Sequence, residues 1–128
     1  MGLTRVALFL GILLFSLNLT YAESEKDPKT AQGSLGIVEF ETSCSDAVSD
    51  DFNRGVALLH HMMYKQAEQV FIEIIEKDPN CAMAYWGFAM TQMHPLWAPP
   101  SKEELAKGLF AVKTAESKSP PTEREQAY

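Results

Sequence analysis

The sequence contains few of the residues on which catalysis or nucleic-acid binding depends. It has two cysteines and three histidines among 128 residues. It has no glycine-rich phosphate loop, no nucleophile elbow and no HExxH motif. Lysine and arginine number 11 against 17 aspartates and glutamates, and they form no cluster that would attract nucleic acid. We therefore expect neither an enzyme nor a nucleic-acid-binding protein, and no cofactor.

No apolar run in the sequence is long enough to predict a membrane span. The longest, Val6 to Leu19, has 14 positions and includes two polar residues, whereas a spanning helix needs about 20 apolar residues. Arg5 precedes this run, and a segment ending in Ala22 follows it with small residues at the cleavage positions. This order predicts a signal peptide over residues 1–22. We expect an exported protein, periplasmic or extracellular, with no stable membrane anchor after cleavage.

The mature chain of 106 residues is long enough for one small domain. Without Arg5 it has ten basic and 17 acidic residues, a net charge of about −7. Residues 23–34 are charged, contain proline and glycine and lack apolar periodicity, so we expect a flexible leader. Within residues 35–45, Ile37, Val38 and Phe40 form a short β-prone run. This run is too short for a sheet, and we expect an extended strap packed against helices.

The pattern is helical from residue 46 onward. Apolar residues recur every three or four positions, Pro79 breaks the pattern, and a proline-rich loop interrupts it again after His94. Ser101 and Thr122 each begin a capping box, which marks the start of a helix. The last of these helices has no visible partner. The expected helices cover approximately residues 46–63, 67–75, 81–93 and 101–117, with a fifth from residue 122.

A shift of 34 residues superimposes the first expected helix on the third. Aromatic residues fall on aromatic, small on small and histidine on histidine. The superimposed pairs are Phe52 and Trp86, Gly55 and Ala89, Val56 and Met90, Leu59 and Met93, and His60 and His94. This period, with two helices in each repeat, is that of the tetratricopeptide repeat family.

The chain resembles the tetratricopeptide (TPR) family over residues 46–128, and in particular exported bacterial TPR-like proteins that contain a DP-x-CAMAYWG…HPLWAPP run. Ala106 and Phe110 repeat the spacing of Ala67 and Phe71 after about five extra residues in the loop. The resemblance implies an all-α, αα-hairpin solenoid of two repeats and the start of a third, completed by further repeats or by self-association. The family positions of the first repeat are Gly55, Leu58, Tyr64, Ala67, Phe71 and Pro79, and those of the second are Tyr85, Phe88 and Ala89.

Small residues at positions 55, 67 and 89 are expected to let the helices approach, with Phe71 and Tyr85 filling the space between hairpins. The resemblance implies that the first helix of each repeat lines a concave groove. Its residues are rich in methionine and aromatic side chains, which suits an apolar protein or peptide partner. The alternative is that the strap or later repeats fill this groove. Trp97 either caps the hairpin core or is an exposed anchor for the partner. The expected groove residues are Phe52, Val56, Leu59, His60, Met83, Trp86, Met90, Met93 and His94.

The histidines and methionines at one end of these helices support an alternative function, copper binding, because sulfur and imidazole are copper ligands. Ordinary packing explains the same residues, and no metal ligand is assigned. The residues concerned are His60, His61, His94, Met62, Met63, Met90 and Met93.

The two cysteines lie on either side of the first helical hairpin. Cys44 precedes its first helix and Cys81 follows its second, so an antiparallel arrangement brings both to the same end. An oxidising compartment would then favour a disulfide. The alternative is a free thiol at Cys44 and a small buried residue at Cys81.

Overall fold

The computed structural model describes residues 35–94 and 98–128. The described residues contain helices and no strand, which confirms the all-α class predicted from the sequence. None of the helices in these two ranges has the length and apolarity to span a membrane. The predicted signal peptide, residues 23–34 and Trp97 lie outside the described residues. The elements are η2 (Asp46–Val48), α2 (Ser49–His60), α3 (Tyr64–Lys77), α4 (Ala82–Thr91), α5 (Lys102–Ser117) and α6 (Glu123–Gln126).

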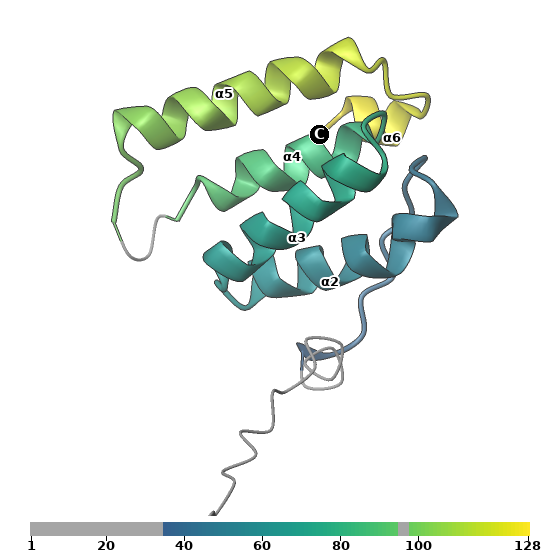
Figure 1. Ribbon diagram of the computed structural model, residues 1–128, viewed down its shortest axis with the longest axis horizontal. Coiled ribbons are helices and arrows are strands. Elements are labelled where there is room, and N and C mark those ends of the chain that lie inside the picture. Colours follow the sequence, from purple (N-terminus) through teal and green to yellow (C-terminus); the bar gives the residue numbers. More distant parts are fainter. Residues whose placement is uncertain (1–34, 95–97) are drawn as a thin grey trace, which may run out of the picture.

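The four long helices form two antiparallel hairpins, α2 with α3 and α4 with α5, that lie side by side (Figure 1). Each helix packs against the next in sequence, and α2 also contacts α4. Met62 ends α2 in the left-handed conformation, with φ of 58°. The Met62 amide donates to the Leu59 carbonyl and the Met63 amide to the Leu58 carbonyl, the two bonds of a Schellman motif. This motif turns the chain directly into α3.

The side chain of Phe71 joins the two hairpins. It is fully buried, and its ring lies between the backbones of Gly55 in α2 and Gly87 in α4. A Cβ added at Gly55 would lie 2.8 Å from this ring, and one added at Gly87 would lie closer still. The prediction of close approach at Gly55 is therefore confirmed. On α4 the contact with Phe71 is made at Gly87, and Ala89 lies where Gly108 of α5 approaches.

Helix α5 packs on α4 through Gly108 and the buried Ala111. A Cβ placed on Gly108 would lie 3.6 Å from the Gln92 Cβ. Ala106 and Phe110 face away, and Phe110 is 73% exposed. The prediction that this pair repeats Ala67 and Phe71 is thus wrong, because α5 meets α4 through the face that contains Gly108.

The strap runs along α2 as an extended segment, from Leu35 beside His61 at the end of that helix to Cys44 near its start. Val38 and Phe40 pack against the core while Ile37 points outward, 93% exposed. The Phe40 amide donates a hydrogen bond to Asn53 Oδ1 at 2.9 Å. Cys44 forms a disulfide with Cys81, which ties the strap to the turn between α3 and α4. The extended strap expected from the sequence is therefore observed, without strand pairing.

The short α6 also packs against the strap. Thr122 caps it as expected, but the Glu125 carboxylate does not complete the capping box. Glu125 Oε1 instead accepts the Ser43 amide at 2.7 Å, and Oε2 accepts the Thr122 hydroxyl at 2.9 Å. The expectation that this helix has no partner is wrong. Its Glu125 carboxylate, which a capping box would use locally, accepts a hydrogen bond from the Ser43 amide of the strap instead.

Candidate binding groove

An apolar groove lies between α2, α4, the strap and the C-terminal segment. Its volume is about 660 Å³, in the range of about 300–1,000 Å³ typical of ligand sites. Six of the ten residues predicted to bind a partner line it, and the remaining lining residues come from the strap, the start of α3 and the C-terminal segment. The lining residues are Phe40, Val56, Leu59, His60, Tyr64, Trp86, Met90, Met93 and Tyr128.

Three aromatic rings form a wall at one end of the groove. The Trp86 ring centroid lies 5.1 Å from that of Tyr128 and 6.0 Å from that of Phe40, and Phe40 lies 5.6 Å from Tyr128. The Arg124 guanidinium sits 4.5 Å from the Phe40 ring centroid, within cation–π distance. The strap therefore closes one end of the groove and does not fill its length.

The other end of the groove is open. Met90 is 41% exposed and Met93 46%, and His60 is also exposed. Methionine side chains are flexible and polarisable, so they adapt to different apolar partners. The groove thus changes from a partly buried aromatic wall at Trp86 to an accessible methionine surface at the C-terminal end of α4.

Two predicted groove residues belong to the core. Phe52 is 0% exposed and packs edge-on against Phe71, with ring centroids 5.7 Å apart, and Met83 is 2% exposed. Neither side chain can contact a partner directly, so their assignment to the groove is wrong. In α4 the reason is that apolar residues occupy all sides of the helix, and periodicity then does not indicate which side faces inward.

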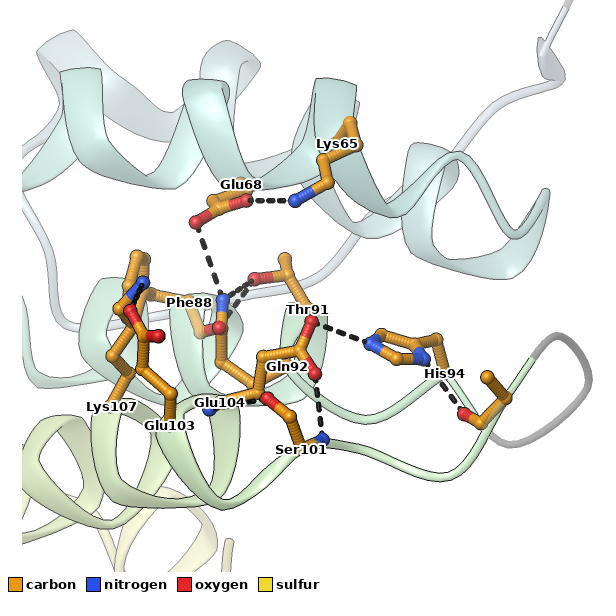
Figure 2. Close-up of polar contacts among 11 residues, drawn as sticks. Lys65, Glu68, Phe88, Thr91, Gln92, His94, Ser101, Glu103, Glu104 and Lys107 are labelled. Carbon is orange, nitrogen blue, oxygen red and sulfur yellow. Dashed lines mark hydrogen bonds and ion pairs between the residues drawn. The ribbon is translucent and has the colours of Figure 1, made fainter.

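His94 lies outside the groove and binds the start of α5 (Figure 2). Its Nε2 is 3.1 Å from Glu104 Oε1 and its Nδ1 is 2.9 Å from the Ala98 carbonyl oxygen. Both partners are acceptors, so the protonated ring, which donates through both nitrogens, satisfies them best. Hydrogen bonding to Glu104, followed by that to Ala98, accordingly raises the pKa of His94. The Ser101 amide, followed by His94, lowers the pKa of Glu104 to about 2.

The structure does not gather the histidines into a metal site. Across residues 35–94 and 98–128, the one group of three or more His, Cys, Asp or Glu side chains with closely spaced ligand atoms is Cys44, Asp78 and Cys81. Its two sulfurs are bonded to each other. His61 Nε2 lies 3.0 Å from the Leu35 carbonyl oxygen, and His94 has the partners given above.

Sequence reasoning missed Phe40, Tyr64 and Tyr128 as groove residues. The β-prone pattern around Phe40 did indicate a segment packed against helices. Tyr128 carries no such signal, because its place depends on the hydrogen bonds of Glu125 with Ser43, 82 residues earlier in the chain. Burial raises the pKa of Glu125, but its bonds with the Ser43 amide and Thr122 outweigh this and leave that pKa below its ordinary value.

Comparison of the chain with protein-family models, with curated proteins and with solved structures finds no match.

Proposed function

We propose that the chain is a TPR-like binding module that holds an apolar segment of a protein partner in its groove. The observation that carries this proposal is the open methionine surface. Met90 and Met93 are about half exposed, yet they continue a wall formed by the largely buried Val56 and Leu59. Exposed apolar surface of this kind on a small domain marks an interaction site.

The TPR-like part of the proposal is supported by the order of helix contacts. The sequence repeats after 34 residues, and α2 and α4, the two helices related by that repeat, both line the groove. Phe71, at a family position, fills the space between the two hairpins. A partner laid across α2 and α4 would meet equivalent positions of both repeats.

Export to the periplasm or the extracellular space is part of the same proposal. The order of charged, apolar and small residues within positions 1–22 supports it, as does a disulfide, which forms and persists in oxidising compartments. In that setting the partner would be another exported protein.

The test is selection of displayed peptides on the immobilised protein, followed by fluorescence titration. The chain has two tryptophans, so Trp97→Phe leaves Trp86 as the reporter within the groove. We expect selected peptides to carry spaced apolar anchors and to change the Trp86 emission. Replacing Met90 and Met93 together by Asp should weaken binding by about tenfold or more, which corresponds to about 1.4 kcal/mol.

Leu105→Asp is the matched control, since Leu105 is 49% exposed, similar to Met93, but lies on α5 outside the groove. It should leave the peptide affinity unchanged. Trp86→Ala is a poor test because Trp86 also packs against the core and two other rings. Peptides that bind the methionine double variant as tightly as the unaltered protein would rule out the groove as the site.

A further inference from the structure

Helix α5 exposes an apolar stripe outside the groove, and one of its residues, Val112, borders a second hollow that Trp86 and Tyr128 of the aromatic wall also line. Leu105, Leu109 and Val112 are 49%, 56% and 39% exposed, and Phe110 beside them is 73% exposed. Leu105, Leu109 and Val112 are separated by four and three residues, so they lie along one face of the helix. Ala111 and Gly108, which contact α4, lie on a different face.

Charged residues continue this stripe at both ends, with opposite sign. Lys102 precedes Leu105 by three positions and Glu116 follows Val112 by four, which completes a 3–4–3–4 spacing along the exposed face. Both charged side chains are exposed, and among the described residues neither forms an ion pair within the chain. The stripe thus runs from a positive end, through an apolar centre, to a negative end.

We propose that this stripe, defined by Lys102, Leu105, Leu109, Val112 and Glu116, binds the same stripe of a second copy in antiparallel orientation. An antiparallel pair centred on Leu109 places Lys102 of each copy near Glu116 of the other and brings the apolar residues together. A parallel pair would place like charges together at both ends, which is unfavourable. The charge pattern therefore fits a twofold-symmetric dimer, in which one surface serves both partners.

The dimensions of α5 set the strength of this dimer. Sixteen residues make a helix of about 24 Å, and one pair of such helices buries an area at the low end of specific interfaces. Each exposed ion pair contributes little binding energy, but two of them select the orientation. The dimer should accordingly dissociate within the micromolar range.

Sedimentation equilibrium of the protein over about a hundredfold range of concentration, at low salt, tests this interface. We expect a monomer–dimer equilibrium. Leu109→Lys should give a monomer, because it places two like charges at the centre of the interface. The variant should remain folded, since Leu109 is exposed and lysine favours helix about as well as leucine. Ile37→Lys, at another strongly exposed position outside α5, is the matched control and should still dimerise.

Charge reversal tests the orientation. Lys102→Glu and Glu116→Lys should each weaken dimerisation several-fold, and the double variant should restore it, because it exchanges the two charges. A protein that is monomeric at every concentration, or a dimer unaffected by Leu109→Lys, would overturn the proposal. A double variant no better than the single ones would refute the antiparallel orientation. Met90→Asp should leave the dimer intact, so the outcome is independent of the groove.

Discussion

Replacing Gly87 by alanine should destabilise the protein, although alanine is the better helix former. In an exposed helix interior, glycine to alanine gains up to about 1 kcal/mol. At Gly87 the new methyl group would overlap the ring of Phe71. The ring cannot move away from Gly87, because its other side lies close to the backbone of Gly55. A Cβ added at Gly55 would lie only 2.8 Å from the ring. Overpacking of this kind costs about 1–3 kcal/mol, so after the gain in helix propensity we expect a net loss of up to about 2 kcal/mol.

Gly108→Ala provides the matched control on α5. Its added Cβ would meet the Gln92 Cβ at 3.6 Å, an ordinary contact, so the gain in helix propensity should remain. Urea unfolding of both variants, followed by circular dichroism, measures the difference. Because both variants gain the same helix propensity, we expect their unfolding free energies to differ by the overpacking cost, about 1–3 kcal/mol.

A double-mutant cycle identifies the cause. Phe71→Leu alone should destabilise the protein by leaving a cavity, but combined with Gly87→Ala it should cost less than the sum of the single changes, because the smaller side chain leaves room for the methyl group. If Gly87→Ala proves as stable as Gly108→Ala, or if the two changes are additive, then Phe71 does not limit the approach of the hairpins.

Further measurements test other features. Reducing the Cys44–Cys81 bridge should lower the unfolding free energy by about 4 kcal/mol at most, since it opens a loop with a sequence separation of 37; titratable thiols in the unreduced, denatured protein would contradict the bridge. Met62→Gly should raise stability by about 0.5–1 kcal/mol in thermal unfolding, because glycine adopts the left-handed conformation without strain. The raised pKa of His94 means that its contribution to stability is complete below pH 6.5 and is lost as the pH rises through the folded-state pKa. His94→Gln should therefore flatten the stability profile immediately above pH 6.5, and an unchanged profile would exclude this role.

The helix boundaries were largely predictable because their signals are local. The Ser101 capping box forms as expected at the start of α5, and the chain breaks at Pro79 as the pattern predicts. Proline geometry and capping hydrogen bonds involve residues a few positions apart. Such features are encoded in short stretches of sequence and need no knowledge of the tertiary fold.

The faces of the helices were less predictable, since they depend on distant contacts. Met83 and Met90 lie on the same apolar helix, yet one is buried and the other is 41% exposed. Nothing in the local pattern distinguishes them. Phe110 lies on the exposed face of α5, because this helix meets α4 through Gly108, a contact that the local pattern does not predict. The C-terminal segment likewise packs against the strap through a distant contact, because the Glu125 carboxylate accepts a hydrogen bond from the Ser43 amide, 82 residues earlier in the chain.

The bridge between Cys44 and Cys81 also determines how the protein would respond to mechanical force. A chain pulled at its two ends transmits tension through the disulfide and bypasses α2 and α3, which both lie between the cysteines. About 125 Å of contour length therefore remains hidden until the bridge is reduced. Under load, α4, α5 and the C-terminal segment would extend while the first hairpin stays closed as a covalent ring.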